Sequence, residues 1–500
     1  MKRLAIILSL SSSPAFAEIT PMDVIESWRT VYAGSGEAIS YDSLQAGPDG
    51  KSVLLNNVTS VSIISDSTST SHFDWVRMQP NIDGGILITF SPAGETVDVT
   101  RLSDGTEITT TARFDFSALA LMATGFPSDI RYSYNAPQVT YSEITGEAAF
   151  GSRMEMTFTG VSGEETAITN VTESGPRVAD FGEYRFERVE VKMESQSLID
   201  APSVTQFVAE HVVVTYRWEF PLTDIPSAPV ALMDLPPQTD LKLEIQTNAI
   251  SGAMSDNSPL GTNTVSFGHE SGGLSMRFAH DQFRFEMVSL GSRLGMRPAA
   301  PERPRFDLGL AELRANITMP FRRETNPAPF SAGLSLNGLA LDEESWASVD
   351  PENSMGRPKA DISTSLSGLM MLTSGIFEGG EGLNGVDAPF FIPDLTVDTL
   401  RIAAGGAVIE GQGDLRFNPR RNDPDTDLPM AKGALDFAII GALGFLDRFG
   451  RLTDVDPMAI LGAKGGLGMF SSPTDAPDSF TSRVEFLSGG GIVVNGQAVR

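Results

Sequence analysis

Residues 185–191 run Arg185-Phe186-Glu187-Arg188-Val189-Glu190-Val191 and set apolar side chains among charged ones. Side chains of a β-strand point alternately to its two faces, so this stretch predicts a strand with one covered face and one wetted face. Similar β-branched or aromatic stretches occur at 86–90, 96–100, 113–116 and 211–218. The dominant secondary structure is therefore predicted to be β-strand.

Short turn clusters separate these stretches, among them Pro48-Asp49-Gly50, Asp83-Gly84-Gly85 and Ser103-Asp104-Gly105. Short strands at this spacing, with no helix between them, favour an antiparallel meander over βαβ units. We predict a mainly β protein of the α+β class. Its extended, curved antiparallel sheets, one or two in number, carry a few short helices.

One helix is predicted at the start of the mature chain. Thr20-Pro21-Met22-Asp23 has the pattern of a capping box with proline at the first helical position. Apolar residues then recur at helical spacing until Gly34, where the pattern ends. The sequence therefore indicates an amphipathic helix here.

Two more helices are predicted near the C-terminus, at residues 441–449 and 456–470. Their apolar residues, Leu461 among them, are expected to cover a face of a sheet. The last strands, within residues 483–494, flank a glycine-rich turn and are expected to form a hairpin that closes the sheet.

The first seventeen residues have the order of a cleaved secretory signal. Lys2-Arg3 is followed by the apolar run 4–10 and by the small-residue site Ala15-Phe16-Ala17. The apolar run is far shorter than the ~20 residues that cross a bilayer. We predict a signal peptide at residues 1–17, a periplasmic location and no transmembrane anchor after cleavage.

Composition excludes several classes of chemistry. The 500-residue chain has no cysteine, which removes disulfides, a thiol nucleophile and a thiolate zinc site. Its formal net charge of −28 disfavours nucleic acid as a partner, because both would be polyanions. The hydrophobic share of 41% is that of an ordinary folded protein.

Prolines concentrate in residues 221–237 and end in the pair Pro236-Pro237, a pattern that predicts a linker or crossover. We therefore divide the mature chain into an N-terminal β-rich domain, residues 18–235, and a C-terminal β-rich domain with short helices, residues 236–500.

Catalytic and cofactor motifs were not found in a usable context. Residues 380–385 have the glycine spacing of a dinucleotide site, but Pro389 and Pro393 block the helix that such a site needs. There is no G-x-S-x-G elbow and no S-x-x-K pair. The four histidines lack metal-site spacing: His72, His211, His269 and His280. We predict a protein that is not an enzyme and has no cofactor.

One metal hypothesis remains. Asp423, Asp425 and Asp427 place carboxylates at alternate positions, as calcium loops do. Leu428 and Ala434 stand where an EF-hand has its glycine and its bidentate glutamate, so an EF-hand is excluded. The alternatives are an open calcium loop and a solvated loop between strands.

The C-terminal segments 433–437, 441–450, 458–470, 478–486 and 491–497 resemble the closing signature of an alphaproteobacterial envelope family, domain of unknown function 2125. More distantly, the order of strand, short helices, strand and terminal hairpin is similar to AsmA-like envelope proteins. That resemblance implies long curved sheets associated with lipids. The wider group usually keeps a membrane anchor, which this chain is predicted to lose.

These observations favour a non-catalytic envelope protein that holds a lipid, another amphiphile or a partner chain on a curved sheet. An uncovered apolar sheet face would support this hypothesis. The second hypothesis is a periplasmic glycan-directed hydrolase, which would need two carboxylates roughly 5 to 9 Å apart in a cleft. The third is a structural interaction protein, whose sheet faces would both be closed.

Overall fold

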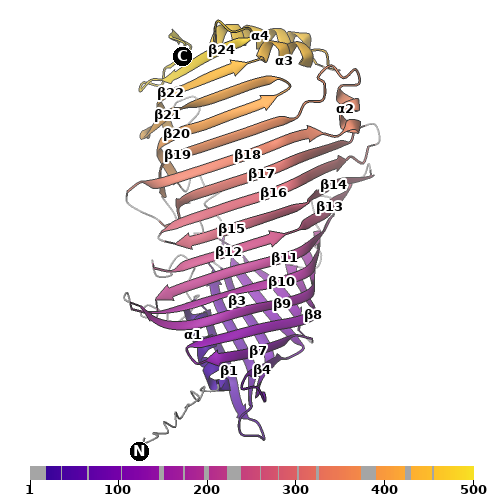
Figure 1. The fold of residues 1–500 in the computed structure, drawn as a ribbon, viewed down its shortest axis with the longest axis vertical. Coiled ribbons are helices and arrows are strands. Elements are labelled where there is room, and N and C mark those ends of the chain that lie inside the picture. The colour runs from indigo at the N-terminus through magenta and orange to yellow at the C-terminus, as the bar shows by residue number, and fades with distance from the viewer. Residues whose placement is uncertain are drawn as a thin grey trace, which may run out of the picture.

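The computed structural model shows one long antiparallel β-sheet, with its first and last strands at opposite ends (Figure 1). The structure describes residues 19–500 except 35–36, 65–66, 103, 117, 146–150, 173–174, 196–201, 222–237, 259–260, 280, 301–302, 323–325, 373–389, 423–428 and 453–454. The mainly β class, with helices near both ends of the chain, is confirmed.

The helices are α1 (Pro21–Gly34), α2 (Glu343–Val349), α3 (Ala442–Phe449) and α4 (Pro457–Phe470). The strands of the first half are β1 (Glu37–Ala46), β2 (Val53–Ile64), β3 (Ser67–Pro80), β4 (Ile86–Phe90), β5 (Ala93–Arg101), β6 (Glu107–Asp115), β7 (Ala120–Phe126), β8 (Asp129–Thr145), β9 (Ser152–Thr172), β10 (Gly175–Ser195), β11 (Ser203–Pro221), β12 (Asp240–Thr247) and β13 (Ala249–Ser258). Those of the second half are β14 (Gly261–His269), β15 (Ser271–Ala279), β16 (Gln282–Arg297), β17 (Phe306–Pro320), β18 (Ala328–Leu341), β19 (Ala360–Leu372), β20 (Phe390–Ala404), β21 (Ala407–Asn422), β22 (Pro429–Ile440), β23 (Ser472–Pro473), β24 (Ser479–Phe486), β25 (Ile492–Val494) and β26 (Gln497–Ala498).

Strands mostly pair with their neighbours in the sequence. Strands β1, β2 and β3 pair in sequence, and β3 pairs with both β4 and β5. Strand β4 pairs with β7 and β5 pairs with β6, and both β6 and β7 pair with β8. Strands β8 to β11 then pair in sequence. Strands β12 and β13 both pair with β11. Strand β15 pairs with β12, strand β14 pairs with β13, and both β14 and β15 pair with β16. Strands β16 to β22 follow in sequence, and β24, β25 and β26 complete the sheet, with β23 on β24.

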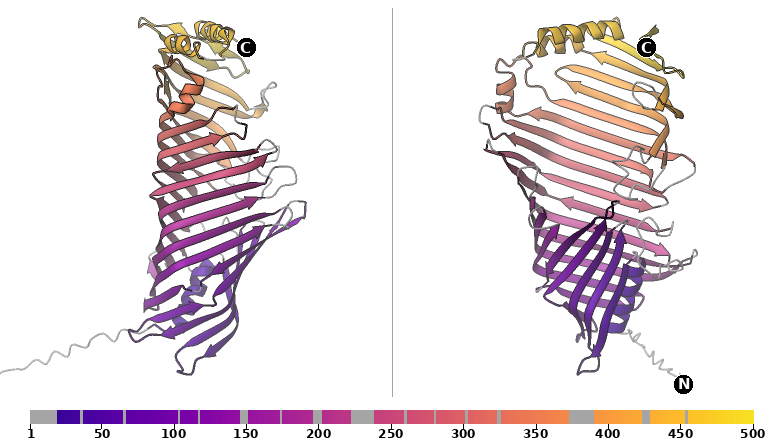
Figure 2. Two further views of the ribbon diagram at one scale, coloured as in Figure 1. Left: turned by 90° about the vertical axis from the view of Figure 1, so that its right-hand side faces the viewer. Right: turned by 180° about the vertical axis from the view of Figure 1, so that it is seen from behind.

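The sheet folds over at its N-terminal end, so that strands β1 to β7 face the following strands across α1 (Figure 2). Helix α1 contacts β1 and β3 on one side and β10 on the other. Val24 and Ile25 of the helix join Leu55, Ile88 and Ile130 of the strands in the largest buried cluster. The largest part of the described core therefore lies at this end, and a small second cluster lies at Phe330, Met370 and Leu372.

The predicted capping box begins α1. The Thr20 amide donates to Asp23 Oδ2 at 2.8 Å, and the Asp23 amide donates to Thr20 Oγ1 at 3.3 Å. The two bonds satisfy amides that a helix start otherwise leaves without a partner. The bounds of the helix, Pro21–Gly34, agree with the prediction.

Strands are longer than the predicted short runs, since β9 and β10 have 21 residues each. The alternation quoted above is interrupted at Glu187-Arg188, where Glu187 and His211 are skipped between the pairs Phe186–Val212 and Arg188–Glu210. One residue is skipped on each strand, so the register does not shift, and His211 has a φ of 48° at this irregularity. Beyond it, Arg188 lies among charged side chains, 2.5 Å from Glu190 and 2.8 Å from Glu210.

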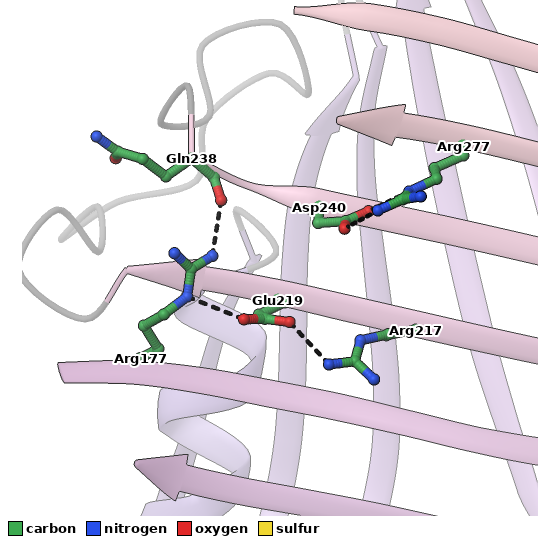
Figure 3. Close-up of polar contacts among 6 residues, drawn as sticks. All are labelled: Arg177, Arg217, Glu219, Gln238, Asp240 and Arg277. Atoms are coloured by element: carbon green, nitrogen blue, oxygen red, sulfur yellow. Dashed lines mark hydrogen bonds and ion pairs between the residues drawn. The ribbon is translucent and has the colours of Figure 1, made fainter. Parts of the chain in front are cut away.

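The sheet is continuous across the predicted domain boundary, because β11 pairs with β12. Arg177 reaches across the boundary to Gln238, and Arg277 pairs with Asp240 on its C-terminal side (Figure 3). Arg177 lies 3.1 Å from Glu219 and donates to the Gln238 carbonyl at 2.7 Å. The Arg277 guanidinium donates to both oxygens of Asp240, at 2.9 and 2.6 Å. The division into two folding domains stays a prediction.

The C-terminal helices lie at one end of the sheet (Figure 1). Asp456 caps α4 by accepting from the Met458 amide at 2.9 Å, and β24 pairs with β22 and β25 as the predicted hairpin requires. The expected cover of a sheet face is wrong for Leu461, which is 62% exposed. Helix α3 contacts α4 and β21. The helix α2, capped by Asp342, was not predicted.

None of the helices in the described part of the chain is both long enough and apolar enough to span a bilayer.

The buried side of α1 predicts an asymmetric response to mutation. Ile25 is 3% exposed in the core, whereas Met22 on the same helix is 48% exposed. Ile25→Ala should lower the free energy of unfolding by about 2–5 kcal/mol, because it leaves a cavity. Met22→Ala should change it by less than about 0.5 kcal/mol. Urea unfolding followed by circular dichroism measures both, and equal effects would show that α1 is not anchored in the core.

Candidate functional site: a cavity between the N-terminal helix and the sheet

A cavity of about 760 Å³ lies beside α1, inside the fold-over of the sheet. Aromatic side chains form one wall. The Trp28 ring of α1 stacks on Phe90 with centroids 6.3 Å apart, and Phe73 lies 5.6 Å from Phe90. A volume of this size is in the range of small-molecule binding sites.

The cavity extends onto the main sheet. Leu241 and Leu243 of β12 and Met276 and Phe278 of β15 also line it. Leu243 pairs with Met276, and Leu241 pairs with Phe278, so the four side chains project from one face. We call this side of the sheet, on which α1 packs, the apolar face, and the opposite side the wet face.

A carboxylate held by tyrosines forms the polar part of the cavity wall. Glu165 of β9 accepts hydrogen bonds from the hydroxyls of Tyr134 on β8 and Tyr184 on β10, the latter at 3.0 Å. In the sheet, Glu165 lies opposite Tyr132 on one side and Gly182 on the other. Its carboxylate is therefore fixed by groups from both neighbouring strands.

Two glycines make room for the tyrosine rings. A Cβ at Gly163 would lie 2.9 Å from the Tyr184 ring, and a Cβ at Gly182 would lie 2.9 Å from the Tyr216 ring. The rings of Tyr184 and Tyr216 stack at 5.7 Å across β10 and β11. Glycine at these two positions therefore lets the rings lie flat on the sheet beside the carboxylate.

A second carboxyl group, Asp180 of β10, also lines the cavity and is only 7% exposed. The Tyr216 hydroxyl donates to its Oδ1 at 3.4 Å. Burial, followed by the charge of Glu165, raises the pKa of Asp180 to about 8. Burial also raises the pKa of Glu37, a third carboxyl group in the wall, despite a hydrogen bond from Ser60.

The tyrosines around the cavity are hydrogen-bond donors at neutral pH. Burial is the largest cause that raises the pKa of each of them: Tyr32, Tyr132, Tyr134, Tyr184 and Tyr216. Loss of a phenolic proton would place another anion beside the carboxylates. The site therefore combines protonated phenols, an acidic wall and apolar surroundings.

Basic side chains do not balance these acids. Among the described residues that line the cavity, Lys242 is the one cation. It alternates with Leu241 and Leu243, and its Nζ lies 2.9 Å from Glu244 Oε2, so its charge belongs to the wet face. On that face acids and bases are paired, as Arg188 and Glu210 are at 2.8 Å.

The sequence-predicted metal site and the dinucleotide-like glycines lie outside the described residues. This applies to Asp423, Asp425 and Asp427 and to residues 380–385, and also to the signal peptide at 1–17. Within the described part of the chain, no group of three or more metal-ligating side chains is found.

The described histidines do not come together. His72 lies 3.5 Å from Asp74, and His211 stands at the irregular position of β11 with a φ of 48°. His269 hydrogen-bonds with Thr247 at 2.8 Å and with the Ser289 hydroxyl at 3.0 Å.

Sequence reasoning missed Glu165, Asp180 and the tyrosines that hold them. In the sequence, Tyr132 and Tyr134 alternate with Arg131 and Ser133, a pattern that places both tyrosines on one face of a strand. The signal that could have identified the site is an acidic residue, Glu165, on the same face of the neighbouring strand. Recognising that Glu165 lies beside these tyrosines requires the pairing register of the two strands, which the sequence does not supply.

Comparison with known proteins yields no match: no family model, curated protein or solved structure is significantly similar to this chain. The resemblance to the domain of unknown function 2125 family and to AsmA-like proteins stays a prediction.

Asp180 predicts a pH-dependent loss of stability. Its pKa is raised in the folded state, so ionisation costs folding free energy as the pH rises from about 4 through about 8. Asp180→Asn cannot ionise, and it should be more stable than wild type by a few kcal/mol above pH ~8. Thermal melting at pH 6 and pH 9 measures this. Glu183→Gln, on the wet face of the same strand, is the control, and a wild-type slope in Asp180→Asn would contradict the assignment.

Proposed function

We propose that this is an exported, non-catalytic envelope protein that holds a lipid or another amphiphile on the apolar face of its sheet. The observation that carries the proposal is a row of directly paired, half-buried residues that leads from the cavity toward the far end of the sheet. We call it the apolar row.

The apolar row crosses ten strands from β12 to β24 in register. Its members are Leu243, Met276, Phe285, Ile317, Ala332, Leu366, Val397, Gly413, Leu435 and Val484. At the other end, Leu243 pairs with Tyr216 in the cavity wall. An acyl chain lying along this row would therefore stay on apolar surface from the cavity outward.

Side chains beside the row are accessible. Leu334, two residues from Ala332 on the same face, is 38% exposed, and Ile402 is 37% exposed. The described helices other than α1 lie at the edge and the far end of the sheet (Figures 1 and 2). A sheet face that is apolar and accessible over such a length is unusual for a protein without a ligand or partner.

The cavity favours an amphiphile over a protein partner. A partner chain would need an accessible surface, whereas this cavity lies inside the fold-over beside α1 and is walled by Trp28 and Phe90. Its size suits a small molecule. A ligand with one polar end and one apolar chain would fill the cavity and continue onto the apolar row.

Glycan hydrolysis is the second candidate, because Glu165 and Asp180 share one cavity and their surroundings differ. Glu165 accepts two tyrosine hydrogen bonds, whereas burial raises the pKa of Asp180 to about 8. Such differences mark acid and base pairs in glycosidases. The remaining wall is mainly aliphatic and aromatic, which does not satisfy sugar hydroxyls. We therefore favour the carrier. Release of nitrophenol from nitrophenyl glycosides, lost in Glu165→Gln, would reverse this choice.

A pair of neighbouring substitutions tests the carrier. Leu334→Glu places a charge on the apolar face, whereas Ser335→Glu places the same charge on the wet face of the same strand. Leu334→Glu should lower the affinity for a long-chain amphiphile about tenfold or more, because the ligand would desolvate a carboxylate. Ser335→Glu should bind as wild type does.

Binding of a hydrophobic fluorescent dye and mass spectrometry of lipid co-purified from the periplasm measure the effect. Absence of both dye binding and co-purified lipid in the wild-type protein would overturn the proposal.

A further inference from the structure

The cavity wall is unusual in the balance of its charges. Glu37, Glu165 and Asp180 all line it, and the one cationic residue of its described lining, Lys242, is paired with Glu244 on the wet face. A buried carboxylate without a cation costs folding free energy. Such a cost is commonly found where a protein binds or transforms a ligand.

Asp180 offers an oxygen to a ligand. The residue is more than nine-tenths buried, with 7% of its surface exposed, and it lines the cavity. Within the described part of the chain, its one hydrogen bond is the one that Oδ1 accepts from Tyr216, at 3.4 Å. Among the described residues, Oδ2 of Asp180 is therefore left without a donor. Glu165, in contrast, is oriented by Tyr134 and Tyr184.

The surroundings of the two carboxyl groups suit a cation with an apolar tail. The stacked rings of Tyr184 and Tyr216 lie beside them, and the negative faces of aromatic rings attract ammonium groups. A phosphate or sulfate in the same place would be repelled by the carboxylates. Beyond Tyr216, the paired residue Leu243 begins the apolar row.

We propose that the cavity binds the positively charged headgroup of an amphiphile, an amine or quaternary ammonium without an anionic group, with Glu165 and Asp180 as its counter-charges. The proposal rests on the proposed carrier function and names the class of its ligand. The headgroup lies between the carboxylates and the tyrosine rings, and the alkyl chain follows the apolar row.

The pH dependence of binding follows from the groups that face Asp180. These are Glu165 from β9, Tyr216 from β11, Tyr132 from β8 and Tyr32 from α1. After burial, the charge of Glu165 raises the pKa of Asp180, whereas the hydrogen bond from the Tyr216 hydroxyl lowers it. A bound cation favours ionised Asp180, so binding releases a proton below pH ~8. Affinity should therefore rise from pH 6 to pH 8 and level off above it.

The test is calorimetric titration of the purified mature protein with four dodecyl amphiphiles below their micelle-forming concentrations. Dodecylamine and dodecyltrimethylammonium carry the cation, dodecyl maltoside is uncharged, and dodecyl sulfate is anionic. The two cations should bind about tenfold or more tightly than the maltoside, and the sulfate most weakly.

Matched variants assign the effect to the cavity. Glu165→Gln should remove the preference for cations, whereas Glu164→Gln, the next residue on the wet face, should keep it. Asp180→Asn should abolish the rise of affinity with pH. Circular dichroism and melting curves establish that each variant folds. If Glu165→Gln does not fold, the pH profile of Asp180→Asn decides.

The outcomes separate the two proposals. If none of the four amphiphiles binds, the carrier function itself fails. If all four bind equally, and Glu165→Gln and Asp180→Asn behave as wild type, the carrier stands and the cationic headgroup is overturned. Preference for the cations that persists in both variants would also overturn it, because the attraction would then come from the general acidity of the chain.

Discussion

The structure depends on the pairing register of its strands: each strand pairs with its neighbours in the sheet so that apolar side chains stand directly opposite one another. Leu243 opposite Met276, and Phe285 opposite Ile317, are two steps of a row that crosses ten strands. A shift by one residue anywhere would turn the apolar set of that strand to the wet face. The irregularity at Glu187 and His211 interrupts the alternation without shifting the register between these long strands.

The two ends of the sheet are covered unequally. At the N-terminal end the sheet folds over α1, and Ile25 and Ile130 are nearly removed from solvent. Farther along, members of the apolar row are half-buried, and Leu334 beside them is 38% exposed. The N-terminal end supplies a packed core and a cavity beside α1, and the rest of the sheet supplies a long apolar surface. We infer that one anchors the polar end of a ligand and the other accepts its chain.

Acidic residues have different partners on the two faces of the sheet. On the wet face, Arg277 and Asp240 form a bidentate pair, and surface pairs of this kind contribute little to stability but keep that face hydrated. On the apolar face, Glu165 and Asp180 have phenols for partners in place of cations. The same residue type is thus a solubilising group on one face and a costly buried charge on the other.

Local structure follows from the amino-acid sequence alone: alternation predicts strands with two different faces, and capping residues such as Thr20 and Asp456 mark where helices begin. The pairing of distant strands, in contrast, is needed to show that the strands form a single sheet, that α1 lies inside its fold-over, and that Glu165 and Asp180 line one cavity. The reason is that alternation and capping act within a few residues, whereas pairing between strands sets which distant side chains meet. Among 64 acidic residues, only that pairing distinguishes these two.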